Sequence, residues 1–148
     1  MKVQIPFLEL LTNRGCNLAC KGCTTYSDIK HSGYNKWEDT RKELEPWLDR
    51  LDLPAIGFMG GEPLVNPDLE NWILGVRELL PNAQIRFVTN GFLTEKKWEI
   101  FELLRDLGNT VYKISYHIPD ARLDQAVNRI KNELDWEPIY EYGIHRLY

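Results

Sequence analysis

The feature that most constrains the fold is a repeat in which strand-like and helix-like segments alternate. Apolar segments typical of strands begin near residues 55, 84, 111 and 138, an interval of about 28 residues that corresponds to one strand plus one returning helix. Strands joined in this way lie parallel, and right-handed crossovers bring their carboxyl ends to one edge of the sheet. The sequence therefore predicts an α/β fold with a mostly parallel sheet and a functional site at that edge.

Hydrophobic periodicity and capping residues place the segments along the chain. Pro46 favours a kink in the first helix. Asn66 and Thr94 are the expected N-caps of the second and third helices, and Gly108 marks the end of the third. The polar stretch 27–36 is expected to be a loop. We expect strands at 5–11, 55–59, 84–88, 110–116 and from 138 onward, and helices at 37–51, 67–80, 95–107 and 120–134.

All three cysteines lie in one loop, residues 14–24, with the spacing Cys-x3-Cys-x2-Cys. Clustered thiolates select soft metals, which are zinc, copper or iron–sulfur clusters. Structural zinc sites and electron-transfer clusters usually take four protein ligands, whereas a 4Fe-4S cluster on three cysteines leaves one iron open to a non-protein ligand. The open iron favours a catalytic cluster. The alternative is a structural zinc site that His31 completes.

The cysteine spacing resembles the signature of the radical S-adenosylmethionine (SAM) superfamily, and Gly-Gly-Glu-Pro at 60–63 resembles that family's GGEP motif. The resemblance implies that Cys16, Cys20 and Cys23 hold a 4Fe-4S cluster, whose open iron binds the amino and carboxylate groups of SAM. The family's core is a partial barrel. The implied fold is therefore a partial (β/α) TIM-like barrel, here with about 4.5 to 5 βα units.

The same resemblance nominates residues that contact SAM. Gly60, Gly61 and Glu62 are carried over as contacts to its amino group, and Pro63 restrains Glu62 to an extended conformation. Ser115 matches a strand position that contacts SAM in relatives. Asn90 begins a common Asn-Gly turn, but its place at the active edge also makes it a candidate for lining the pocket.

Aromatic residues and a histidine are further candidates for contacts with adenine or substrate. Many family members carry an aromatic residue just before the third cysteine, where this chain has Gly22. Tyr26 is a candidate replacement near the adenine, with a plain loop aromatic as the alternative. Tyr116 and His117 are candidates for substrate contact, and His117 could move a proton near neutral pH.

The resemblance also implies a reaction. A reduced cluster would pass one electron to SAM, which cleaves to methionine and a 5'-deoxyadenosyl radical that abstracts hydrogen from a substrate. Val-Thr-Asn-Gly at 88–91 and Ile-Ser-Tyr at 114–116 look most like the broad group related to molybdenum-cofactor and peptide-modifying enzymes. The implied partners are a small-molecule or peptide substrate and an electron donor such as flavodoxin or ferredoxin.

Residues 1–148 are expected to form a single domain that lacks the last unit or units of the family's usual six. A partner chain, or a homodimer that covers the open sheet edge, could complete the barrel. The short length also supports an alternative function. In that alternative the chain is a non-catalytic iron–sulfur or zinc binding protein, either a truncated remnant or half of a split enzyme.

Composition excludes several classes of partner. Eighteen basic and 22 acidic residues give a net charge of −4, and no run of like charge is present, so nucleic acid and anionic membranes are not expected partners. The apolar segment at the amino terminus is too short for a signal peptide, and no segment is long enough to span a membrane. Clustered cysteines without a disulfide framework indicate a reducing compartment, so we expect a cytoplasmic protein.

Overall fold

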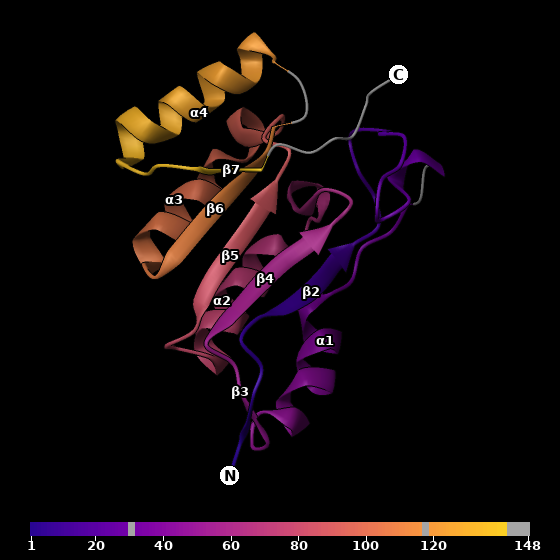
Figure 1. The fold of residues 1–148 in the computed structure, drawn as a ribbon, viewed down its shortest axis with the longest axis vertical. Coiled ribbons are helices and arrows are strands. Elements are labelled where there is room, and N and C mark those ends of the chain that lie inside the picture. The colour runs from indigo at the N-terminus through magenta and orange to yellow at the C-terminus, as the bar shows by residue number, and fades with distance from the viewer. Residues whose placement is uncertain (30–31, 117–118, 142–148) are drawn as a thin grey trace.

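The computed structural model describes residues 1–29, 32–116 and 119–141, and it contains an open five-stranded parallel sheet (Figure 1). The strand order is β2-β4-β5-β6-β7, and every neighbouring pair is parallel. The strands are β2 (Leu8–Asn13), β4 (Ala55–Gly60), β5 (Gln84–Thr89), β6 (Thr110–Ser115) and β7 (Ile139–Glu141). The expected α/β fold with a mostly parallel sheet is confirmed, and the sheet is consistent with a partial barrel that is not closed.

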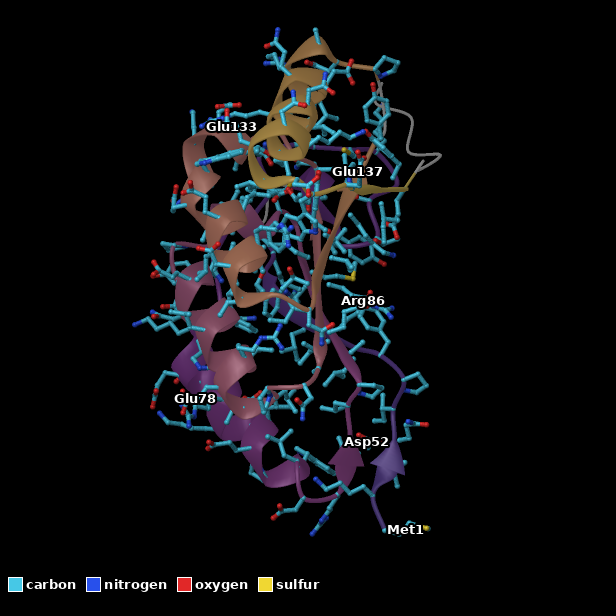
Figure 2. The ribbon with its side chains drawn as sticks, turned by 90° about the vertical axis from the view of Figure 1, so that its left-hand side faces the viewer. Met1, Asp52, Glu78, Arg86, Glu133 and Glu137 are labelled. Carbon is cyan, nitrogen blue, oxygen red and sulfur yellow. The ribbon has the colours of Figure 1, made fainter. Side chains whose placement is uncertain are left out.

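The helices cover one face of this sheet and leave the other face open (Figures 1 and 2). They are α1 (Trp37–Leu44), α2 (Leu69–Leu79), α3 (Trp98–Leu107) and α4 (Ala121–Leu134). Short 3-10 turns η1 (Ser27–Ile29), η2 (Glu45–Trp47), η3 (Pro63–Val65) and η4 (Thr94–Lys97) lie in the connections. Among the helices of the described ranges, none is long and apolar enough to cross a membrane.

Alternate residues of each central strand face the helices and form the core. Phe58, Phe87 and Tyr112, on three adjacent strands, are fully buried there. The Phe101 ring of α3 packs edge-on between Phe87 and Tyr112, with ring centroids 5.9 Å away from each, a favourable arrangement of aromatic quadrupoles. This packing fixes the strands relative to one another and therefore fixes the position of their carboxyl ends.

The first strand differs from its expected range of 5–11. The chain forms a short strand β1 (Val3–Gln4), which pairs in parallel with β3 (Leu51–Asp52), and then enters the main sheet at Leu8. Pro6 lies between the two segments and has no amide hydrogen to donate, so a continuous ladder is interrupted there. The final strand, expected from 138 onward, covers Ile139–Glu141 within the described residues.

Helix starts and ends differ from expectation where a proline interrupts the helical hydrogen bonds or where a polar side chain offers a competing one. The first helix ends at Leu44 and tightens into η2 around Pro46, so it does not reach residue 51. Asn66 does not cap α2 directly: its Oδ1 accepts a hydrogen bond from the Asp68 amide at 2.8 Å, and Asp68 is the N-cap. These local bonds compete with the first helical turn.

The third helix also begins later than expected. Thr94 Oγ1 donates to the Gly91 carbonyl oxygen at 2.7 Å and starts η4 rather than capping α3, which begins at Trp98. Gly108 does end this helix, with a φ of +63° that favours glycine. The stretch expected to be a loop contains η1 and a bridge between Tyr34 and Asn13.

Candidate functional site

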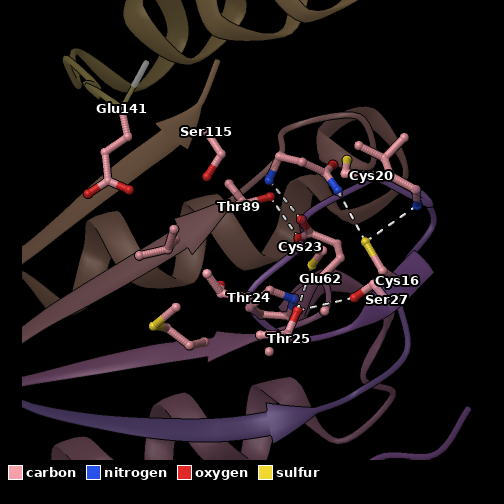
Figure 3. Close-up of a pocket in the computed structure, with 17 residues that line it drawn as sticks. Cys16, Cys20, Cys23, Thr24, Thr25, Ser27, Glu62, Thr89, Ser115 and Glu141 are labelled. Carbon is pink, nitrogen blue, oxygen red and sulfur yellow. Dashed lines mark hydrogen bonds between the residues drawn. The ribbon is translucent and has the colours of Figure 1, made fainter. Parts of the chain in front are cut away.

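A cavity of about 210 Å³ lies at the carboxyl ends of the strands (Figure 3). Residues from the cysteine loop, from the segment after β4, from the end of β5 and from the last residue of β6 line it. The four segments that the sequence places at this edge therefore meet around one space, and Glu141 at the end of β7 joins them. The convergence follows from the parallel sheet, because every strand delivers its last residues to the same side.

The three cysteines are free thiols and all line this cavity. Cys20 is buried, with 8% of its surface exposed, whereas Cys16 and Cys23 are half-buried. Burial raises the pKa of the Cys16 and Cys20 thiols. Burial also acts to raise the pKa of Cys23, but hydrogen bonds from Thr25 and Ser27 outweigh it, so this pKa lies below its ordinary value.

The three thiols are the kind of donor that a soft metal selects. Sulfur ligands suit zinc, copper or an iron–sulfur cluster, and three of them around one cavity would leave one iron of a 4Fe-4S cluster open to a further ligand. Within residues 1–29, 32–116 and 119–141, no three His, Cys, Asp or Glu side chains are placed to hold a single metal ion. His31, the fourth ligand of the zinc alternative, lies outside the described residues.

Glu62 is a buried carboxylate beside the cysteines, with 1% of its surface exposed. Its Oε1 accepts hydrogen bonds from the Leu64 amide at 3.1 Å and from Thr89 Oγ1 at 2.7 Å, and its Oε2 accepts one from the Asn90 amide at 2.7 Å. Burial raises the pKa of Glu62 to about 7, although the three hydrogen bonds act in the opposite direction. The carboxylate thus joins the ends of β4 and β5 and can change charge near neutral pH.

The two glycines before Glu62 allow the cysteine loop to approach β4. A Cβ atom on Gly61 would collide with the carbonyl oxygen of Gly15 and lie 2.6 Å from that of Arg14. A Cβ atom on Gly60 would collide with the Asn13 carbonyl oxygen. The Gly61 amide donates to that Asn13 oxygen at 3.1 Å. Glycine is therefore required here by close backbone contact.

Sequence reasoning missed the polar residues that hold this junction together. Thr12 and Asn13 are buried at the end of β2. Asn13 Nδ2 donates to the carbonyl oxygens of Gly15 at 2.6 Å and Glu62 at 3.0 Å, and Thr12 Oγ1 donates to that of Met59 at 3.0 Å. The signal available in the sequence was a polar Thr-Asn pair at the end of an apolar strand, directly before the cysteine loop.

The other predicted site residues have different positions. Asn90 and Ser115 line the cavity. Tyr26 is 67% exposed, with a φ of +57°, and is not among the described residues that line the cavity. Tyr116 also lies outside that lining, and its hydroxyl donates to Asp124 Oδ1 at 2.9 Å. His117 is outside the described residues.

Comparison with known proteins adds sequence evidence to this geometry. The sequence model of the Radical SAM superfamily matches residues 10–142. GTP 3',8-cyclase of Campylobacter fetus subsp. fetus is 26% identical over 134 residues, which cover 88% of this chain and 40% of that protein. Molybdenum cofactor biosynthesis protein 1 of Dictyostelium discoideum is 28% identical over 139 residues, which cover 91% of this chain and 21% of that protein. The chain thus spans less than half the length of these curated relatives.

Solved structures share the fold. Streptococcus suis SuiB bound to S-adenosylmethionine superposes with a TM-score of 0.75 at 19% identity, over 97% of this chain and 35% of that chain. BtrN in complex with AdoMet and 2-DOIA gives a TM-score of 0.70 at 23% identity, over 95% of this chain and 57% of that chain. At these identities the likeness establishes the fold alone.

Proposed function

Because the chain belongs to the radical SAM superfamily, whose sequence model matches residues 10–142, we propose that it is a radical SAM enzyme whose cavity takes a 4Fe-4S cluster and S-adenosylmethionine. When bound, these groups supply the one-electron cleavage of SAM to methionine and a 5'-deoxyadenosyl radical, which abstracts hydrogen from a substrate. The observation that carries the proposal is that three free thiols and a buried carboxylate line one cavity.

The cysteines would hold the iron as thiolates. Cys16 Sγ accepts a hydrogen bond from the Leu18 amide at 3.3 Å, and Cys23 Sγ lies 3.1 Å from Thr25 Oγ1. Donors at these positions stabilise negative charge on sulfur. At Cys16 the donor only partly offsets the burial that raises the pKa, whereas the pKa of Cys23 is lowered, so Cys23 is the thiol prepared to be a ligand before any metal enters.

Glu62 would attract the positively charged methionine end of SAM. A cation beside a carboxylate favours the ionised form, so binding of SAM is expected to lower the pKa of Glu62 from about 7. Gly60 and Gly61 would let the ligand lie close to the backbone. Ser115 lines the cavity from β6, and we propose it as a further SAM contact.

The substrate would enter over the open face of the sheet, beside Ser115 and Glu141. Glu141 lines the cavity, and its Oε1 accepts a hydrogen bond from Lys113 Nζ at 2.6 Å. This ion pair makes the entrance polar, which suits a polar small molecule or a peptide. Both kinds occur among the structural neighbours, since BtrN is complexed with 2-DOIA and SuiB with the precursor peptide SuiA.

We also propose the partners and compartment that this chemistry needs. An electron donor such as flavodoxin or ferredoxin would reduce the cluster. Strands β2 and β7 each have one neighbour in the described sheet, so a partner chain or a second copy could pair with either edge. Free clustered thiols require a reducing compartment, and we therefore place the protein in the cytoplasm.

The test is anaerobic reconstitution with iron and sulfide, reduction with dithionite in the presence of SAM, and chromatography for 5'-deoxyadenosine. The matched control is Cys20→Ala, which should lose both the cluster and the product. Formation of 5'-deoxyadenosine by the wild type, but not by Cys20→Ala, supports the proposal that the protein is a radical SAM enzyme. A loaded wild-type cluster that gives no product would favour the non-catalytic iron–sulfur protein. Failure to develop the brown colour of a cluster would favour the zinc site.

A further inference from the structure

Asn90 connects the end of β5 to the cysteine loop through its side chain. Its Nδ2 donates to Asn17 Oδ1 at 2.8 Å and lies 3.8 Å from Cys16 Sγ, within the longer reach of a hydrogen bond to sulfur. The two amide hydrogens of this nitrogen can serve both acceptors. Cys16 Sγ therefore has a donor from a neighbouring strand end in addition to the Leu18 amide of its own loop.

The remaining hydrogen-bonding groups of Asn90 hold it in place. Its Oδ1 accepts a hydrogen bond from the Phe92 amide at 3.1 Å, and its own backbone amide donates to Glu62 Oε2 at 2.7 Å. Only 6% of its surface is exposed. The side-chain amide is therefore directed at Cys16 and Asn17 by contacts that do not involve any ligand.

We infer that Asn90 is a positioning residue that stabilises the Cys16 thiolate and raises the reduction potential of the bound cluster. Reduction adds negative charge to the cluster and its sulfur ligands, and N–H donors to those sulfurs stabilise that charge. The inference rests on the proposed function, because it concerns the cluster that Cys16 would hold. This role differs from that of a SAM contact, because it predicts a change in the reduction potential of the cluster even when SAM is absent.

The chemistry of the pair also explains why the residue is an asparagine. In the thiol form, Cys16 Sγ lies 3.8 Å from Asn17 Oδ1 and can donate to it. As a thiolate, Cys16 can only accept a hydrogen bond. One N–H of the Asn90 side-chain amide can then face Cys16 Sγ while the other still donates to Asn17 Oδ1. Aspartate has the same shape, but at neutral pH it would place a second negative charge there and donate nothing.

The test measures the midpoint potential of the reconstituted cluster without SAM, by redox titration followed by electron paramagnetic resonance. The variants are Asn90→Asp and Asn90→Ala. The control is Asn71→Asp at an exposed position on α2, where Asn71 Nδ2 donates to Asp68 Oδ1 at 2.7 Å. Iron and sulfide per chain are measured for each protein. We expect a lower potential in both Asn90 variants, a larger shift for aspartate than for alanine, and no shift in the control.

An unchanged potential in both Asn90 variants, with wild-type iron content, would overturn the inference even if SAM affinity falls. If these two variants do not hold iron, the same titration on Asn90→Ser decides. The serine hydroxyl can still accept the Phe92 amide hydrogen bond, but it is too short to reach Cys16 Sγ, which lies 3.8 Å from the asparagine nitrogen. A lowered potential in Asn90→Ser supports the inference, and a wild-type potential refutes it. A wild-type protein that takes up no cluster would overturn the proposed function together with this inference.

Discussion

Replacing Glu62 with glutamine should remove a specific part of the pH dependence of folding. Burial raises the pKa of this carboxyl from 4.5 to about 7 in the native state. Between these values the native protein binds more protons than the unfolded chain does, so the free energy of unfolding falls as the pH rises. The loss is complete above about pH 7, where Glu62 is ionised in both states.

The magnitude follows from the difference between the two pKa values. At about 1.36 kcal/mol for each pH unit, the change from 4.5 to about 7 costs the wild type about 3 kcal/mol between about pH 4 and about pH 8. Glutamine cannot ionise, so Glu62→Gln should escape this loss. Glu62→Gln carries a separate cost of about 1–3 kcal/mol at every pH, because its NH2 group would face the Leu64 or the Asn90 backbone amide, each of which can only donate.

The assay is urea unfolding of the cluster-free protein at both pH values, with the difference between wild type and Glu62→Gln taken at each. This difference should change by about 3 kcal/mol in favour of the variant as the pH rises. Glu70→Gln, at an exposed position on α2, controls for the loss of a carboxylate. If the free energies of unfolding of Glu62→Gln and the wild type differ by the same amount at both pH values, the reasoning is refuted.

Three further changes test other contacts. Gly61→Ala should lower the free energy of unfolding by about 2 kcal/mol, because its Cβ would collide with the Gly15 carbonyl oxygen; a wild-type melting temperature would contradict this. Thr25→Val removes a hydrogen bond that lowers the pKa of Cys23. The pH at which Cys23 becomes reactive toward an alkylating reagent, monitored by mass spectrometry of the cluster-free protein, should therefore rise. An unchanged pH profile would argue against this hydrogen bond. Tyr112→Phe deletes a buried hydrogen bond of 3.1 Å to the Trp136 carbonyl oxygen. The free energy of unfolding, measured in urea, should fall by about 1 kcal/mol, and iron binding should not change. Loss of iron would contradict a purely local effect of this bond.

Much of the fold could be predicted because local patterns set it. Alternating apolar residues such as Ile85 and Phe87 require one buried strand face, and the repeat of strand and helix leaves few topologies other than a parallel sheet. The helix starts were less predictable. Asn66 and Thr94 both suit an N-cap, and only the folded chain offers the competing partners that draw them elsewhere.

The sequence by itself determined the donor set of the site and the edge where it lies. Three cysteines in one loop and a Gly-Gly-Glu run after a strand are local facts, and parallel strands bring such segments to one side. The tertiary structure decided which side chains touch. The Glu62 carboxylate meets the Asn90 amide 28 positions away, and the Asn90 side chain meets Cys16 at a separation of 74. These contacts depend on strand register, on the close approach at Gly61 and on side-chain rotamers, and no spacing along the chain encodes a hydrogen bond between two strand ends.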